Sequence, residues 1–178
     1  PVNWCLDCGS ALAEAEVEYE DKKSDAIYVG FDVVNREALA ATKAIDGALQ
    51  AVIWTTTPWT LPANQAITVS EVLEYSVIKT DKGNFILAYN LVPHLMSVFN
   101  AKEYSVVATV KGDALTVLKA QHPLIAERQV PIITGDHVTA DSGTGLVHTA
   151  PAHGVDDYMV GQKFHLPTEN PVAGNGVY

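Results

Sequence analysis

Apolar and polar residues alternate along much of this chain with the two-residue period that is typical of half-buried strands. Every second residue over 27–33 is apolar, and Val17 and Tyr19 alternate with acids shortly before. The pattern predicts two antiparallel strands. Further strands are predicted by apolar runs at 49–54, 66–69, 75–80, 85–89, 103–111, 115–120 and 130–134. The strands at 75–80 and 85–89 are joined by Asp-Lys-Gly-Asn, which has the composition of a hairpin turn.

Helical patterns are fewer. An alanine-rich helix is expected over 36–45, with Asn35 as its N-cap and Gly47 at its end. A second helix is expected over 90–100, and a third from Val155. We expect the strand at 115–120 to pair with 103–111. The pattern predicts a mainly β fold with α, a closed or nearly closed β-barrel with peripheral helices. Because no repeat or linker interrupts it, we expect one domain over 15–178, with 1–14 as a lead-in.

Composition narrows the function classes. The 178 residues are 48% apolar and 18% charged, which is typical of a globular protein. No apolar run approaches the roughly 20 residues that span a bilayer, so no membrane partner is expected. The net charge of −10, from 21 acidic and 11 basic residues, argues against binding nucleic acid by charge alone. Without an initiating methionine or a signal pattern, the chain is interpreted as a piece of a longer, cytoplasmic polypeptide, and as a monomer.

A cysteine pair lies near the start of the chain. Cys5 and Cys8 are spaced like half of a structural zinc site, but four ligands are needed and no second pair follows. A disulfide and two reduced thiols are the alternatives. We expect no metal in this chain.

Residues 54–64 are unusually rich in hydroxyl groups. The sequence Trp-Thr-Thr-Thr-Pro-Trp-Thr-Leu-Pro-Ala-Asn sets four threonines between two predicted strands. A hydroxyl buried without a partner costs about 1 to 3 kcal/mol, so this cluster favours a wet, concave site that hydrogen-bonds a ligand.

A second segment, 143–157, supplies titratable groups. His148 is expected at the end of a short strand after a glycine-rich turn, with Asp156 and Asp157 in the first turn of the next helix. We interpret Asp156 as stabilising the helix N-terminus, and Asp157 as a ligand-binding group provided that it points toward His148. Zinc bound by His148, His153 and an aspartate is an alternative, although this spacing matches no known metal signature. The other histidines are interpreted as surface or core residues: His94, His122, His137 and His165.

Both segments resemble one family. Residues 55–64 closely resemble the threonine-rich region of the editing domain, connective peptide 1, of bacterial-type isoleucyl-tRNA synthetases. Residues 143–151, followed by Asp-Asp-Tyr at 156–158, resemble that domain's second signature. Related valyl and leucyl editing domains carry Arg-Pro after two threonines, where this chain has Thr57-Pro58-Trp59. The resemblance covers essentially the whole chain.

The resemblance implies hydrolysis of the ester between valine and the isoleucine tRNA, and of valyl-adenylate as a second substrate. It places the substrate α-ammonium on Asp157 and makes His148 a wall of the side-chain pocket that rejects isoleucine. It implies substrate or water contacts for the hydroxyl- and amide-bearing residues and for one tryptophan: Thr55, Thr56, Thr57, Trp59 and Asn64. Thr57, Asn64, His148 and Asp157 are the expected catalytic set.

The partners implied are the valine-carrying 3′ end of tRNA(Ile) and the rest of the synthetase, whose ATP-binding core is not recognisable here. No cofactor is implied for editing. In the parent enzyme, Cys5 and Cys8 are implied to form a zinc site with a second pair of ligands beyond this chain. The alternative is a non-catalytic module that binds the amino acid or the tRNA 3′ end.

Overall fold

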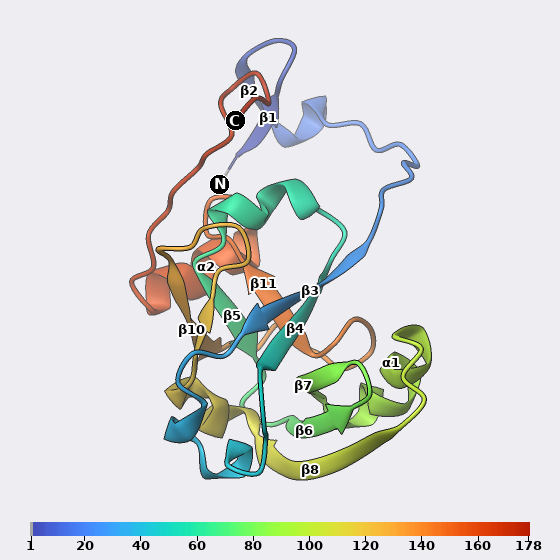
Figure 1. Ribbon diagram of the computed structural model, residues 1–178. Coiled ribbons are helices and arrows are strands. Elements are labelled where there is room, and N and C mark those ends of the chain that lie inside the picture. The colour runs from blue at the N-terminus through green and yellow to red at the C-terminus, as the bar shows by residue number, and fades with distance from the viewer. Residues whose placement is uncertain (1) are drawn as a thin grey trace.

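Figure 1 shows the computed structural model, which describes residues 2–178. The strands are β1 (Asn3–Cys5), β2 (Ser10–Leu12), β3 (Ile27–Asp32), β4 (Leu49–Thr55), β5 (Ala66–Val69), β6 (Glu74–Thr80), β7 (Gly83–Ala88), β8 (Tyr104–Lys111), β9 (Lys119–Gln121), β10 (Gln129–Thr134) and β11 (Leu146–Thr149). The α-helices are α1 (Val92–Val98) and α2 (Val155–Lys163). Short 3-10 helices are η1 (Glu14–Glu16), η2 (Arg36–Ala38), η3 (Ala40–Thr42), η4 (Pro58–Ala63), η5 (Tyr89–Leu91) and η6 (Gly112–Val117).

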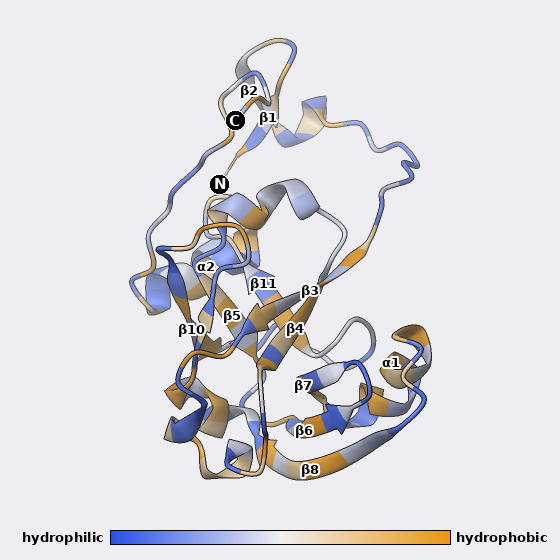
Figure 2. Cartoon of the chain, viewed as in Figure 1, coloured by the Kyte–Doolittle hydropathy of each residue, from blue (hydrophilic) through white to orange (hydrophobic). Residues whose placement is uncertain are grey.

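The larger sheet has the strand order β3-β4-β7-β6-β8. β3 and β4 are antiparallel, with Ile27 opposite Thr55. β4 runs parallel to β7, and the β6–β7 hairpin forms at the predicted turn. Because side chains alternate between the two faces of a strand, Ala51 and Ile53 of β4 are fully buried on one face. Figure 2 shows the hydrophobic residues that follow β4 and β5 through the centre of the molecule.

The second sheet has the order β11-β5-β10-β9. β5 is antiparallel to β11, with Ile67 opposite His148, and parallel to β10. One isolated bridge, between Val33 and Ala120, links the end of β3 to β9. The main apolar core includes residues of both sheets, among them Phe31, Ile53, Ile67, Val77, Ile86, Ile132 and Leu146.

The mainly β class with helices is confirmed, but the closed or nearly closed barrel is not. Over residues 2–178 both sheets are open, with β3 and β8 at the edges of one and β11 and β9 at the edges of the other. A single bridge is too short a contact to continue the ladder of hydrogen bonds around a barrel. No helix in this range is long and apolar enough to cross a membrane.

Three local predictions are wrong. The helix expected over 36–45 is replaced by η2 and η3. Asn35 does not cap it, because its side chain instead bonds the β9 region, donating to Val117 O (2.9 Å) and accepting from Lys119 N–H (2.7 Å). No strand forms at 17–19, where Val17 is half-buried and the next two residues are exposed. Residues 115–120 begin within η6, and β9 pairs with β10 instead of β8.

The β1–β2 hairpin lies apart from the two larger sheets, at the end of the molecule where it meets the C-terminal segment (Figure 1). Trp4 Nε1–H donates to Gly174 O at 2.8 Å, which joins this hairpin to the C-terminal segment. The two long connections from this end to the sheets are mostly hydrophilic (Figure 2). The division of the chain at residue 14 stays a prediction.

Candidate functional site

A cavity of about 280 Å³ lies where β4 ends, between η4, β11 and the first turn of α2. It brings together the two polar segments singled out in the sequence. Its lining includes Thr55, Thr56, Thr57, Thr60, His148 and Asp157. The threonine segment and the histidine-aspartate segment are therefore one site, although about 90 residues separate them along the chain.

The threonine segment changes conformation at the end of β4. Thr55 Oγ1 accepts the Thr57 backbone N–H at 3.0 Å and lies 3.3 Å from Thr57 Oγ1. Pro58 then begins η4, where its fixed φ is favourable and its missing N–H costs nothing. Because the strand ends at Thr55, the alternation of an extended chain no longer applies. All four threonines reach the cavity wall, with Thr56 and Thr57 exposed to solvent and Thr55 and Thr60 buried.

His148 projects from β11 into a set of directed hydrogen bonds. Asn64 Nδ2 donates to Ala66 O at 2.9 Å and lies 2.6 Å from His148 Nδ1, so that ring nitrogen accepts. The proton must then be on His148 Nε2, which donates to Thr60 Oγ1 at 2.8 Å. Thr60 Oγ1 in turn donates a hydrogen bond to Thr57 O at 2.8 Å. Both ring nitrogens are occupied, and the imidazole is fixed in one tautomer.

The same ring is held neutral. Burial, together with the neighbouring His122 and His153, lowers the pKa of His148 to about 4. At neutral pH the ring therefore carries no charge. It can shape the cavity and accept or donate the bonds already described, but it cannot attract an anion.

Asp157 supplies the negative charge of the site. It lies in the first turn of α2, after the N-cap Gly154, and an added Cβ on Gly154 would lie 2.5 Å from Asp157 Oδ2. The carboxylate therefore folds back over the helix N-terminus and lines the cavity with His148. Burial and the nearby Asp156 raise the pKa of Asp157 to about 6, against the Ala150 backbone N–H, which lowers it. A poorly solvated carboxylate attracts a cation, and Asp156, which is exposed, does not line the cavity.

Replacing Asp157 with asparagine should stabilise the fold at neutral pH. The folded chain binds this proton more tightly than the unfolded chain, so the carboxylate lowers stability as pH rises from about 4 to 6. Each pKa unit corresponds to about 1.4 kcal/mol, and partial solvent contact reduces the effect to about 1 to 2 kcal/mol. Urea unfolding of Asp157→Asn and of the parent chain should give equal stability near pH 4 and a stabler variant at pH 7. A difference that does not grow with pH contradicts this result, and Asp21→Asn, at an exposed position outside the cavity lining, is the control.

Two predicted site residues lie outside the cavity lining. Asn64 is fully buried and contacts His148, so the structure places it behind the wall, where it can hold the histidine. Trp59 is 52% exposed, and its carbonyl accepts a hydrogen bond from the Tyr178 hydroxyl. Their contacts with substrate stay predictions.

Sequence reasoning missed part of the lining. Trp54, His137 and His153 all line the cavity, whereas the sequence suggested His153 only as a zinc ligand and His137 only as a surface or core residue. Trp54 could have been identified as the last residue before the threonines, but His137 comes from a turn after β10 that no motif marks. His122, in contrast, is a buried residue with partners on both ring nitrogens, as interpreted from the sequence.

The residues described here do not form a metal site. Over residues 2–178 no three histidine, cysteine or acidic side chains come together as ligands. Cys5 and Cys8 face one another at the knuckle, where the Cys8 backbone N–H donates to Cys5 Sγ at 3.3 Å and lowers the pKa of the Cys5 thiol. Two thiols fit half of a tetrahedral zinc site, so a zinc ion there would need ligands from outside this chain.

A family model that matches most of the chain shows which family it belongs to. The family model described as "Leucyl-tRNA synthetase, editing domain" matches residues 48–176, which contain the whole cavity wall. This chain belongs to the tRNA-synthetase editing-domain family. The whole chain is 65% identical to part of the isoleucine–tRNA ligase of Psychrobacter arcticus and 56% identical to part of that of Acinetobacter baylyi. It spans 19% and 20% of their lengths, so the editing domain is one part of an isoleucyl-tRNA synthetase.

Solved structures agree on the fold. The crystal structure of GlLeuRS-CP1 matches with a TM-score of 0.64 at 16% identity, over 78% of this chain and 60% of that one. The Plasmodium knowlesi cytosolic leucyl-tRNA synthetase editing domain matches with a TM-score of 0.65 at 12% identity, over 79% and 62%. At these identities the similarity supports the fold of the editing domain alone.

Proposed function

We propose that this editing domain hydrolyses the ester between valine and tRNA(Ile), and that valyl-adenylate is a second substrate. The observation that carries the proposal is the pairing of Asp157 and His148 across one cavity. A partly buried carboxylate suits the α-ammonium of an aminoacyl group, and a fixed neutral ring suits an apolar side chain.

The chemistry assigned to the cavity is attack by water. The water oxygen bonds to the ester carbonyl carbon, and the bond from that carbon to the terminal ribose oxygen breaks. The ribose oxygen takes up one proton from the attacking water. Free valine and tRNA(Ile) are the products. We assign hydrogen bonds with the ester or the water to Thr56 and Thr57, because both residues are exposed and line the cavity. In this proposal Thr57 belongs to the catalytic set, and Asn64 acts through His148.

Such a second site is needed because binding alone separates the two amino acids poorly. A missing methylene is worth only about 1 to 3 kcal/mol, a limit for which isoleucyl-tRNA synthetases are themselves a known case. A cavity that excludes isoleucine by size and admits valine removes the errors. The partners proposed are therefore the valine-carrying 3′ end of tRNA(Ile) and the remainder of the synthetase.

One observation favours a second candidate, a binding module without turnover. Both nitrogens of His148 are occupied by hydrogen bonds, so this ring has no free position at which to accept a proton from water. A single assay separates the two functions. Valyl-tRNA(Ile) is incubated with the full-length synthetase without ATP, and free valine is measured. We expect release well above the spontaneous rate, whereas tRNA binding without release supports the binding module.

A further inference from the structure

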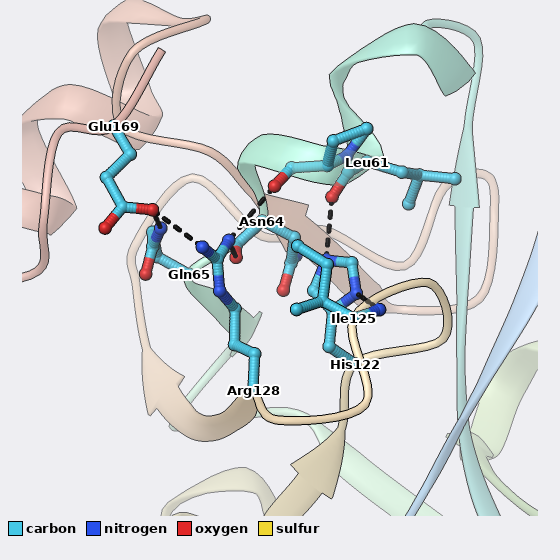
Figure 3. A network of polar contacts seen from close by, with 8 residues as sticks. Leu61, Asn64, Gln65, His122, Ile125, Arg128 and Glu169 are labelled. Atoms are coloured by element: carbon cyan, nitrogen blue, oxygen red, sulfur yellow. Dashed lines mark hydrogen bonds and ion pairs between the residues drawn. The ribbon is translucent and has the colours of Figure 1, made fainter. Parts of the chain in front are cut away.

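A cluster of polar contacts lies behind the cavity, at the end of η4 (Figure 3). The last carbonyls of a helix have no partners inside it, and a short 3-10 helix leaves several of them free. Here the connection between β9 and β10 supplies the donors. His122 Nε2 lies 2.9 Å from Leu61 O. Arg128 Nη1 donates to Pro62 O at 3.0 Å and to Asn64 O at 3.2 Å.

The histidine in this cluster is a fixed donor. His122 Nδ1 accepts the backbone N–H groups of Leu124 (3.1 Å) and Ile125 (3.0 Å). Its proton is therefore on Nε2, which donates to Leu61 O. Burial lowers the pKa of His122 below its ordinary value, so the ring stays neutral at neutral pH.

Arg128 is held at its other side. Its Nη2 lies 2.6 Å from Glu169 Oε2, an oxygen that also accepts from Gln65 Nε2 at 3.2 Å. Because the glutamate is more than half exposed, this ion pair contributes little stability by itself. It does orient the planar guanidinium, whose donors then meet two backbone carbonyls at once.

The contacts continue from Arg128 to the cavity through Asn64. Arg128 Nη1 donates a hydrogen bond to the Asn64 carbonyl, and Asn64 Nδ2 donates one to His148 Nδ1. The other side-chain atom, Asn64 Oδ1, is buried and has no hydrogen-bond partner in the described residues. The amide group therefore lacks a tether on its oxygen side. On its nitrogen side the amide also donates to Ala66 O, two residues further along the chain, so the placement of the backbone over 64–66 decides where the amide meets His148.

We propose that Arg128 is a positioning residue of the editing site, which fixes Asn64 and through it the tautomer and location of His148. Arg128 lies outside the cavity lining. It acts on discrimination, because a shift in the His148 ring changes the size of the space offered to the amino-acid side chain. This inference rests on the function proposed above.

The chain offers a matched control. It contains two arginines, and the second, Arg36, also donates to two backbone carbonyls, those of Ile45 and Gly47. Those carbonyls lie in the loop before β4, and Arg36 does not line the cavity. Arg36→Ala therefore removes the same kind of contact without reaching His148.

The test compares Arg128→Ala and Arg36→Ala in the full-length synthetase. Deacylation of valyl-tRNA(Ile) and isoleucyl-tRNA(Ile) is measured for each variant. Because small misplacements in a reacting site cost up to about 100-fold, we expect Arg128→Ala to lower kcat for valine by about 10- to 100-fold with little change in KM. The isoleucine-to-valine ratio should rise about tenfold or more. Arg36→Ala should change that ratio less than about twofold.

Arg128→Lys keeps the charge but loses the planar fork, so its ratio should lie between those of the parent and Arg128→Ala. This variant also covers the case in which Arg128→Ala does not fold. Equal ratios in Arg128→Lys, Arg36→Ala and the parent overturn the proposal.

A second measurement does not depend on turnover. The ring ¹⁵N shifts of His148 in the 178-residue chain should show an unprotonated Nδ1 and a protonated Nε2, and Arg128→Lys or Arg128→Ala should mix the two tautomers. Unchanged His148 shifts in a folded variant overturn the positioning role. If the parent enzyme releases no valine, the proposed hydrolysis fails, while the ring shifts still decide whether Arg128 fixes His148.

Discussion

Asp157→Ala should reduce deacylation of valyl-tRNA(Ile) by about 100-fold or more. In the proposed complex this carboxylate is the partner of the substrate α-ammonium, and truncating one member of a buried charge pair costs about 2 to 5 kcal/mol. No other acidic residue lines the cavity among the described residues, so nothing nearby takes over the role. The measurement is valine release by the full-length synthetase, compared with Asp156→Ala, whose exposed side chain does not line the cavity.

The same residue sets the acid side of the pH profile. Only the ionised carboxylate attracts an ammonium, and the pKa of Asp157 is raised to about 6. For the parent enzyme, kcat/KM should therefore fall as pH decreases through about 6, because this parameter reports the free enzyme. Asp157→Asn should lose that limb along with most of its activity. Normal deacylation by Asp157→Ala refutes the assignment.

His148→Ala should allow isoleucyl-tRNA(Ile) to be hydrolysed. The ring forms a wall of the cavity and is held on both sides, by Asn64 and Thr60, so it cannot move aside for a larger side chain. Removing it leaves space for the additional methylene of isoleucine, and the steric rejection that it provides is lost. We expect deacylation of isoleucyl-tRNA(Ile) to rise at least about tenfold, in line with the value of one methylene in a pocket.

Two controls make this result specific. His148→Leu replaces the ring with an apolar side chain of similar size and should retain most of the rejection of isoleucine. His94→Ala alters an exposed histidine on α1, outside the cavity lining, and should change nothing. If His148→Ala still hydrolyses only valyl-tRNA(Ile), His148 does not set the size limit.

The structure also explains how the roles within the threonine segment divide. Thr55 and Thr60 use their hydroxyls inside the protein, one to close the turn after β4 and the other to join His148 to η4. Thr56 and Thr57 remain exposed at the cavity. The backbone turn at Pro58 makes this division, because it ends the strand and lets both kinds of threonine reach the same wall.

Several elements could be predicted from sequence because their signals are local. β6 and β7 have clear alternation and a hairpin turn between them, and β11 follows a glycine-rich turn. The helix expected over 36–45 does not form. Its predicted N-cap, Asn35, instead hydrogen-bonds the backbone of Val117 and Lys119, more than 80 residues away. Barrel closure could not be predicted either, because it depends on how the edges of two sheets meet and not on any single strand.

For the site, the sequence by itself determined which chemical groups are available: a cluster of threonines, a histidine after a glycine-rich turn, and an aspartate at a helix start. Only the tertiary structure decided which of them share a cavity and in what state. The pKa of Asp157 is raised and His148 is held neutral because other parts of the chain exclude water around them. Arg128 carries no local signal at all, since its importance comes from the carbonyls of Pro62 and Asn64, which folding brings to it.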